Sequence, residues 1–213
     1  MNDNCRQHWE KVWSGSAHAN KSWFQETPRI SLQLIGRSGV SPAAPLIDIG
    51  GGASRLADHL LDLGYRDLTV LDLSAAALEH ARQRLGERAG AVSWIVGDVT
   101  TFQPGRRYAL WHDRAAFHFL VSASDRKAYG EVMRKSLQPD GQAIIGTFAP
   151  DGPVKCSGLD IVRYDAGSLM AELGPGWELA EETGEVHMTP GGAEQRFGFY
   201  RIRRKTTPEK HSG

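Results

Sequence analysis

Strand-like and helix-like segments alternate through the middle of this 213-residue chain. Five short apolar or β-branched runs are predicted to be strands, at residues 46–49, 68–73, 92–96, 108–112 and 142–148. Between several of these runs, apolar residues recur at three- and four-residue spacing, which is typical of amphipathic helices. Such alternation favours parallel strands whose connecting helices cover the sheet. The sequence therefore predicts an α/β fold.

The last third of the chain follows a different pattern. A short helix is expected at residues 168–173, and two strand-like runs follow at 185–188 and 196–202. Pro190-Gly191-Gly192 forms a turn signal between these two runs. Two strands joined by a short loop favour an antiparallel hairpin, which we expect to close one edge of the sheet.

The first 40 residues are rich in aromatic side chains, including Trp9, Trp13, Trp23 and Phe24. We expect this segment to form a helix or lid across the end of the sheet. Residues 1–205 are predicted to form a single domain. The tail at 206–213 contains little that could be buried and is expected to be mobile.

Composition and charge exclude several functional classes. Lys plus Arg number 25, as do Asp plus Glu, and a net charge of zero argues against a protein that binds nucleic acid through a basic surface. No apolar run approaches membrane-spanning length and no signal peptide is visible, so we expect a cytoplasmic protein that binds no membrane. Two cysteines, Cys5 and Cys156, cannot form a four-cysteine zinc site, and no metal site is predicted.

A glycine-rich turn follows the first strand and opens the next helix, in the run Leu46-Ile47-Asp48-Ile49-Gly50-Gly51-Gly52-Ala53-Ser54. Glycines permit tight dihedrals and let a ligand lie against the backbone. Unpaired N–H groups at the helix N-terminus add a positive partial charge. Because ligands of open α/β sheets bind at the carboxyl ends of strands, this turn is predicted to hold a nucleotide-like cofactor.

The neighbouring residues distinguish between cofactor classes. Asp72 ends the second strand, where a carboxylate can accept both hydroxyls of a ribose. The dinucleotide fingerprint needs a third glycine at the position of Arg55, which disfavours a nicotinamide or flavin cofactor. Asp48 would repel a pyrophosphate but suits a cofactor with an ammonium and a sulfonium group. These features favour S-adenosylmethionine.

The next two strand ends fit the same cofactor. The third strand ends in Gly97-Asp98-Val99, where an acidic side chain can accept the adenine amino group. The fourth strand runs into Trp111-His112-Asp113-Arg114. Four such features in order, each at a strand end, are much more specific than the glycine turn alone.

On these motifs the chain resembles the class I, seven-stranded S-adenosylmethionine-dependent methyltransferases, over residues 45–148. The runs 49–56, 63–67 and 72–74 look especially like the elongation-factor lysine methyltransferase branch. The family often has Cys where Gly51 stands, and the fourth strand lacks that branch's usual Asp-Lys-Gly motif. Bacterial methyltransferases of unassigned substrate resemble the chain over a longer stretch, including residues 111–120.

The resemblance implies a Rossmann-like, seven-stranded, mostly parallel sheet with helices on both faces and an antiparallel C-terminal hairpin. It also assigns cofactor-binding residues, which lie in the glycine turn and at the ends of the second and third strands. These are Asp48, Gly50, Gly51, Gly52, Asp72, Leu73, Gly97, Asp98 and Val99.

Two residues near the end of the fourth strand are the predicted catalytic residues. The resemblance places Asp113 beside the transferable methyl group. If the acceptor must lose a proton, a neutral imidazole could act as the base. We favour His118, which lies past the strand end, over His112, which alternates with Asp113 inside the strand.

The acceptor itself stays open. A small molecule is favoured slightly, because the chain has no large insertion that could dock a protein. A protein-lysine methyltransferase is the alternative, and six Glu with no Lys or Arg between Ala166 and Gln195 would suit a cationic acceptor. A non-catalytic module that binds S-adenosylmethionine is the alternative from another class. No nucleic-acid partner is expected, since the fourth strand has no motif that holds a flipped base.

Overall fold

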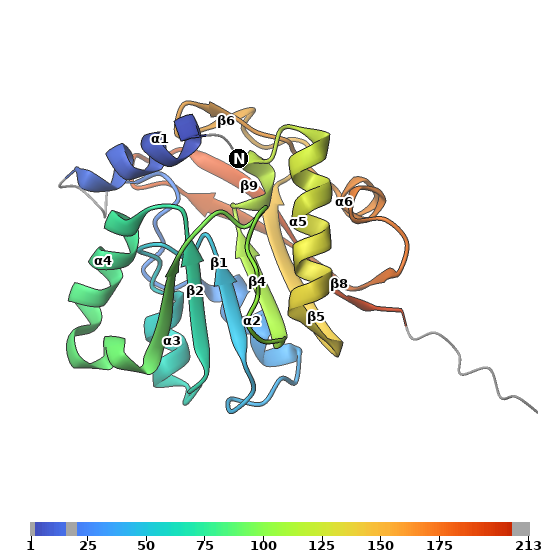
Figure 1. The fold of residues 1–213 in the computed structure, drawn as a ribbon. Helices are drawn as coiled ribbons and strands as arrows, with labels where there is room; N and C mark the ends of the chain where they lie inside the picture. The colour runs from blue at the N-terminus through green and yellow to red at the C-terminus, as the bar shows by residue number, and fades with distance from the viewer. Residues whose placement is uncertain (1–2, 16–20, 206–213) are drawn as a thin grey trace, which may run out of the picture.

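Seven strands form one sheet, with the spatial order β3-β2-β1-β4-β5-β9-β8 (Figure 1). The computed structural model describes residues 3–15 and 21–205, so the predicted mobile tail lies outside the described residues. The parallel strands are β1 (Leu46–Ile49), β2 (Leu68–Asp72), β3 (Val92–Val96), β4 (Tyr108–Arg114) and β5 (Leu137–Phe148). Strand β9 (Glu194–Arg204) pairs antiparallel with both β5 and β8 (Trp177–Met188), so β8 runs in the same direction as β5. The predicted mostly parallel, Rossmann-like sheet with a C-terminal hairpin is confirmed.

The direction in which strands are added reverses at β1. The chain builds β1, β2 and β3 toward one edge and then crosses to place β4 and β5 on the other side of β1. In open α/β sheets, the connections that leave such a point diverge and open a crevice at the carboxyl ends of the strands. The glycine turn after β1 and the loop after β4 therefore border the same crevice.

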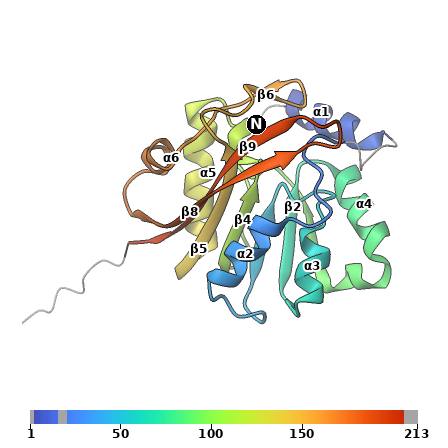
Figure 2. The same cartoon turned by 180° about the vertical axis from the view of Figure 1, so that it is seen from behind.

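Helices cover both faces of the sheet, as predicted (Figures 1 and 2). One face carries α2 (Arg29–Arg37), α3 (Leu56–Asp62) and α4 (Ala75–Leu85), whose apolar residues pack with those of the central strands. The other carries α5 (Ala123–Ser136) and α6 (Ala166–Leu173), which pack around Trp111 and Trp177. Strand β1 is buried along its whole length because both of its faces are covered.

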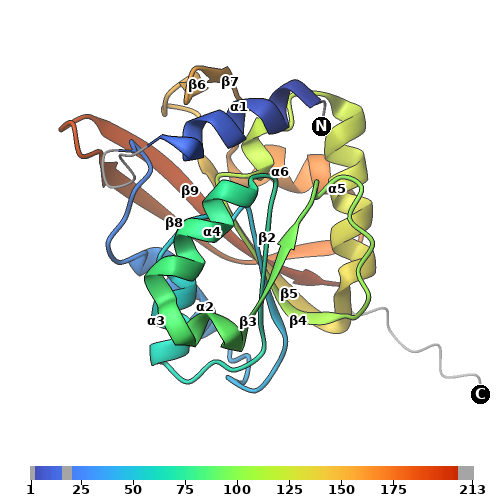
Figure 3. The same cartoon turned by 60° about the vertical axis from the view of Figure 1, so that its left-hand side comes forward.

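Helix α1 (Asp3–Ser14) lies across the carboxyl end of the sheet, beside the start of α4 (Figures 1 and 3). The Glu10 carboxylate accepts hydrogen bonds from the Ser74 hydroxyl at 2.7 Å and from the Ala76 N–H at 3.2 Å. The Trp13 carbonyl is bonded to His80 at 2.9 Å. Glu10 thus brings a negative charge to the positive end of the α4 dipole, which holds α1 in place.

Several elements differ from the sequence expectations. Strand β5 begins at Leu137, before the strand predicted at 142–148, and its register with β4 shifts between Leu137 and Gln142. Strand β8 runs unbroken through its polar middle because Glu178 and Glu181 pair with Arg203 and Arg201 of β9. The short helices η1 (Gly86–Ala91) and η2 (Phe117–Phe119) and the small hairpin β6 (Lys155–Cys156)–β7 (Leu159–Asp160) were not predicted.

Candidate active site

The glycine turn forms the floor of the crevice. Gly50 and Gly52 have φ angles of +65° and +41°, a left-handed region that residues with a side chain rarely adopt. A Cβ on Gly51 would overlap the carboxylate of Asp48, and one on Gly52 would lie 2.8 Å from Asp72 Oδ2. The three glycines therefore leave bare backbone between the two carboxylates, which is the space a cofactor needs.

Asp48 is held by a buried hydrogen-bond chain. His112 Nδ1 lies 2.7 Å from Asp48 Oδ1, and His112 Nε2 lies 2.9 Å from the Ser31 hydroxyl. Asp48 is 5% exposed and His112 2% exposed, and the two residues are register partners on β1 and β4. With a neutral ring, Nδ1–H donates to Asp48 and Nε2 accepts from Ser31, so the chain fixes the carboxylate beside the turn. His112 is thus a site residue that sequence reasoning passed over.

Asp72 reaches the crevice from the end of β2. Its Oδ1 accepts a hydrogen bond from the Ser74 N–H at 2.8 Å. The pKa of Asp72 is raised to about 7, chiefly by burial and also by the nearby charges of Asp48 and Glu10, while hydrogen bonds from the backbone of Ser74 and Gly52 act to lower it. A carboxylate with so little solvation is a strong acceptor for paired hydroxyl groups.

The loop after β3 supplies the opposite wall. Gly97 and Val99 line the cavity together with Leu73 of the β2 loop. Asp98 does not line it: its Oδ1 accepts bonds from the N–H and hydroxyl of Thr100, at 2.8 and 2.7 Å. Burial opposes ionisation of Asp98, but hydrogen bonds, including those from Thr100, outweigh it and lower the pKa. Asp98 therefore shapes this loop from behind.

The two predicted catalytic residues lie in the protein interior. The Asp113 carboxylate, 0% exposed, accepts bonds from the N–H groups of Ala116 and Phe117, at 2.9 and 3.2 Å, and from the Tyr129 hydroxyl at 2.8 Å. Burial raises its pKa to about 6. Its side chain faces α5, whereas the neighbouring His112 faces the crevice. Asp113 thus fixes the loop after β4 and does not line the cavity.

His118 is also fully buried and does not line the cavity. Its Nδ1 accepts a long hydrogen bond from the Phe148 N–H at 3.4 Å, and its ring packs on those of Phe119 and Phe148. Burial, together with the charge of Arg114, lowers the pKa of His118 to about 3. The ring is therefore neutral near pH 7, but it sits behind Phe119 and out of reach of a molecule in the cavity.

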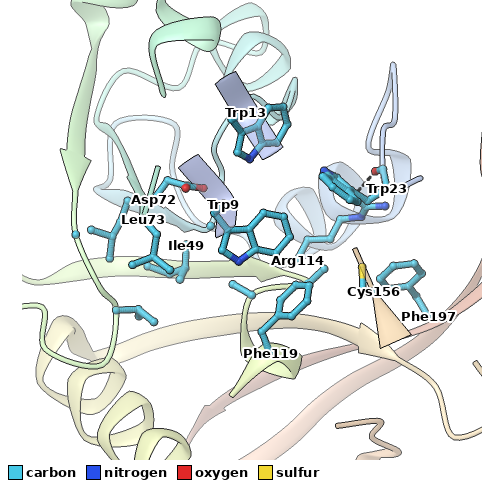
Figure 4. A pocket seen from close by; sticks show the side chains of 16 residues that line it. Trp9, Trp13, Trp23, Ile49, Asp72, Leu73, Arg114, Phe119, Cys156 and Phe197 are labelled. Carbon is cyan, nitrogen blue, oxygen red and sulfur yellow. Dashed lines mark hydrogen bonds between the residues drawn. The ribbon is translucent and has the colours of Figure 1, made fainter. Parts of the chain in front are cut away.

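Arg114 and Cys156 are site residues that the sequence did not single out for this role. Both line the cavity at the end opposite Asp72, as Figure 4 shows. The guanidinium of Arg114 donates to the Trp23 carbonyl at 3.0 Å and lies 5.1 Å from the Phe197 ring centre. Burial raises the pKa of the Cys156 thiol to about 11, so it is protonated near pH 7.

Aromatic rings enclose the cavity on several sides. Trp9 of α1 meets Phe119 and Trp23 edge to face, with ring centres 5.0 and 5.6 Å apart, and Trp13 meets Trp23 at 6.1 Å. The aromatic-rich segment within the first 40 residues thus supplies three tryptophans to the wall of the cavity. One cavity runs from Asp72 and Leu73 past Ile49 to Arg114 and Phe197 (Figure 4). A second, lined by Asp48, Gly51, Ser54 and His112, adjoins it at Gly50 and Arg114.

The topology and the carboxylates at the strand ends match a known family. Residues 46–141 match the family model described as a methyltransferase domain. These residues form a class I methyltransferase domain. The seven-stranded order, with β9 inserted antiparallel between β5 and β8, and the glycine turn after β1 agree with this match.

Curated relatives of this methyltransferase are distant and longer. It is 25% identical over 153 residues, 70% of its length, to the eEF1A lysine and N-terminal methyltransferase of Danio rerio, of which it covers 22%. It is 27% identical over 110 residues, 51% of its length, to the malonyl-[acyl-carrier protein] O-methyltransferase of Anoxybacillus flavithermus, of which it covers 40%. The chain thus spans less than half the length of either relative.

Solved structures of methyltransferases share the fold over nearly the whole chain. The N-methyltransferase NodS from Bradyrhizobium japonicum WM9, in complex with S-adenosylhomocysteine, has a TM-score of 0.72 at 19% identity, over 96% of this chain and 100% of that one. The 1,6-didemethyltoxoflavin-N1-methyltransferase of Burkholderia thailandensis has a TM-score of 0.67 at 20% identity, over 95% of this chain and 85% of that one. At these identities the likeness concerns the fold.

Among the described residues, no group of His, Cys, Asp and Glu side chains is arranged to hold a metal ion. None of the helices within residues 3–15 and 21–205 is long and apolar enough to cross a membrane.

Proposed function

We propose that this methyltransferase transfers a methyl group from S-adenosylmethionine to a small molecule bound at the aromatic end of the cavity. The observation that carries the proposal is the continuity of that cavity, which joins the Asp72 end to a pocket walled by Trp9, Phe119 and Phe197. A walled pocket suits a small acceptor, because the lining side chains can surround it.

The residues present fit the cofactor. In this proposal Asp72 accepts the ribose hydroxyls, and Leu73, Gly97 and Val99 border the adenine, with Asp98 supporting their loop. Asp48 faces the ammonium group of the methionine part, which lies against Gly50, Gly51 and Gly52. The bare backbone supports this assignment, since a Cβ at Gly51 or Gly52 would occupy the space between the two carboxylates. When bound, the cofactor supplies an already activated methyl group.

The protein's part in the reaction is orientation. Bringing the acceptor and the methyl group to near-attack distance accounts for much of such a rate enhancement. We assign Asp113 and His118 positioning roles in place of the catalytic roles predicted for them: Asp113 fixes the loop that carries Ala115 and Ala116 into the cavity, and His118 supports Phe119. Among the described residues that line the aromatic end, Arg114 and Cys156 are the titratable ones. Neither is a base near pH 7, so the acceptor must arrive in its nucleophilic form.

Measurements of cofactor affinity at several pH values test the proposed binding of S-adenosylmethionine through Asp72. Asp72 must be ionised to accept two hydroxyl hydrogen bonds, and its pKa is about 7. The affinity for S-adenosylhomocysteine, measured by calorimetry, should therefore rise with pH up to about 7 and level off above it. Asp72→Ala should weaken binding by roughly 1–3 kcal/mol and abolish this dependence.

Asp62→Ala is the matched control, because Asp62 is an exposed carboxylate on α3 whose ion pair with Arg88 lies on the surface. This variant should bind as the wild type does. Unchanged affinity of the Asp72→Ala protein would refute the ribose contact, and failure of the wild type to bind either form of the cofactor would refute the proposed function.

Transfer itself can be followed with S-adenosylmethionine that carries a labelled methyl group and a cell extract separated by filtration. The small-molecule proposal expects label in the filtrate, dependent on Asp72. Label in the protein fraction would instead support the lysine alternative, which rests on relatives named as eEF1A lysine methyltransferases. Binding without transfer to either fraction would indicate a non-catalytic module.

We also place the protein in the cytoplasm and without a nucleic-acid partner. Within residues 3–15 and 21–205 neither Cys5 nor Cys156 forms a disulfide, which fits a reducing compartment. Equal numbers of acidic and basic residues give the chain no net charge that would favour nucleic acid.

A further inference from the structure

Arg114 carries hydrogen-bond donors that the protein does not use. Its Nη1 donates to the Trp23 carbonyl at 3.0 Å. Its Nε and Nη2 are both shielded from solvent and have no hydrogen-bond partner among the described residues. A buried donor without a partner costs about 1–3 kcal/mol, and more when it belongs to a charged group. An arginine is the residue whose planar fork can bind both oxygens of one carboxylate or other oxyanion.

The carboxylates near Arg114 form their hydrogen bonds with other residues. Burial lowers its pKa, while Glu185, Cys156 and Asp48 raise it by their negative or potentially negative charge. Asp48 is engaged by His112, and Glu185 Oε1 accepts from Gln25 at 2.7 Å. No salt bridge joins Arg114 to either carboxylate in the part of the chain that the structure describes. The guanidinium therefore lines the cavity as a cation that feels the charges of Glu185 and Asp48 but forms an ion pair with neither of them in the described residues.

The surroundings of Arg114 are aromatic. The guanidinium lies over Phe197 of β9, and Trp9, Trp23 and Phe119 enclose the same end of the cavity. In Figure 4 the Arg114 side chain extends toward Trp23, on the far side of Trp9 from Asp72. Flat apolar walls with one cation fit a flat apolar molecule that carries one negative charge.

We propose that the acceptor is a small molecule with an aromatic or apolar body and an oxyanion, such as a carboxylate, that binds the free donors of Arg114. This inference rests on the proposed function and specifies its substrate class. A buried cation at this end also disfavours a positively charged acceptor, which separates the inference from the lysine alternative.

One other source of a carboxylate must be distinguished, namely the methionine part of the cofactor. Arg114 borders both cavities, and the second holds the glycine turn. The acceptor is favoured because Arg114 is stacked on Phe197 and lies near Cys156, at the end of the cavity away from Asp72.

The test uses the full chain saturated with S-adenosylhomocysteine, so that the cofactor part of the cavity is filled. Three aromatic carboxylates, benzoate, indolecarboxylate and naphthoate, are titrated by tryptophan fluorescence, each against its own neutral amide. We expect the best carboxylate to bind about 10- to 100-fold more tightly than its amide, as a paired, charge-assisted contact predicts. Arg114→Gln should remove this preference, and Arg114→Lys should retain part of it.

Arg106→Gln is the control, since Arg106 is an exposed arginine paired with Asp67, and it should behave as the wild type does. Retained binding of S-adenosylhomocysteine shows that each variant is folded. 5′-Methylthioadenosine, which lacks the amino-acid part of the cofactor, distinguishes the two sources of carboxylate. The inference expects Arg114→Gln to leave the affinity for both nucleosides within about twofold.

Three other outcomes would contradict the inference, the proposed function or both. If Arg114→Gln weakens S-adenosylhomocysteine but not 5′-methylthioadenosine, Arg114 binds the cofactor's carboxylate and the inference is overturned. If the wild type binds S-adenosylhomocysteine but prefers none of the carboxylates to its amide, the inference fails and the proposed function stands. If the wild type does not bind S-adenosylhomocysteine, the proposed function fails and the inference with it.

Discussion

Replacing Gly51 by alanine should be costly, because the space for a side chain is already occupied. A Cβ there would overlap the Asp48 carboxylate and lie 2.8 Å from Val70 Cγ1. The carboxylate cannot move freely, since His112 holds it at 2.7 Å from the far side. The variant must therefore displace Asp48 from His112, and the added methyl group still overpacks the turn against Val70.

The expected loss of stability follows from these contacts. Overpacking costs about 1–3 kcal/mol, and losing a hydrogen bond to a charged acceptor costs about 1.5–3 kcal/mol. The lower entropy of the unfolded alanine chain offsets about 0.5–1 kcal/mol of this. Gly51→Ala should therefore lower the free energy of unfolding by about 2–5 kcal/mol.

Urea unfolding monitored by circular dichroism measures this loss. Gly130→Ala is the matched control: Gly130 lies in helix α5 with no atom close to the place of a Cβ, so this variant should gain about 0.5–1 kcal/mol. The double variant Asp48→Ala/Gly51→Ala removes the clash, so its loss should be smaller than the sum of the two single losses. A Gly51→Ala protein as stable as the wild type, or strictly additive losses, would refute this reasoning.

Two further predictions concern buried or bridging carboxylates. Burial raises the pKa of Asp113 to about 6, against about 4 in an unfolded chain, so the folded state holds this proton more tightly. The contribution of Asp113 to stability should therefore fall by about 2–3 kcal/mol as pH rises from about 4 to about 6 and then stay constant. Asp113→Asn should lack this part of the pH dependence in urea unfolding, and identical pH slopes for both proteins would contradict the assignment. Glu10→Ala should loosen α1 by removing its bonds to Ser74 and Ala76; hydrogen exchange should then speed up in α1 but not in the exposed control Glu79→Ala, and equal protection in all three proteins would count against it.

The local part of the site could be predicted from the sequence. Asp48 stands next to last in β1, and the three glycines that follow the strand predict a turn without side chains. The structure has that turn directly after β1. Asp72 ends β2, and Ser74 caps α4 by accepting the Ala77 N–H at 3.1 Å. These features are determined by residues close in sequence, so local chemistry is enough to place them.

The end of β4 shows where such reasoning stops. Successive side chains of a strand point to opposite faces, so either His112 or Asp113 can face the crevice, but not both. Strand β4 is buried on both sides, and its burial pattern therefore gives no sign of which face is which. The register supplies the answer: Asp48 lies opposite His112, so His112 shares its face, and Arg114 two residues later does too. Asp113 then has to point toward α5 and Tyr129.

The acceptor end of the cavity is harder still to predict, because its walls come from distant segments. Trp9, Arg114, Cys156 and Phe197 belong to α1, β4, β6 and β9, and no local pattern relates them. What brings them together is the topology: β9 inserts next to β5, the β6–β7 hairpin follows β5, and Glu10 fixes α1 on the N-terminus of α4. Only once these elements are placed does Arg114 become a buried cation with unused donors, since in the sequence it is one arginine among many. The cofactor end is thus specified by short motifs, whereas the acceptor end is specified by the packing of the whole fold.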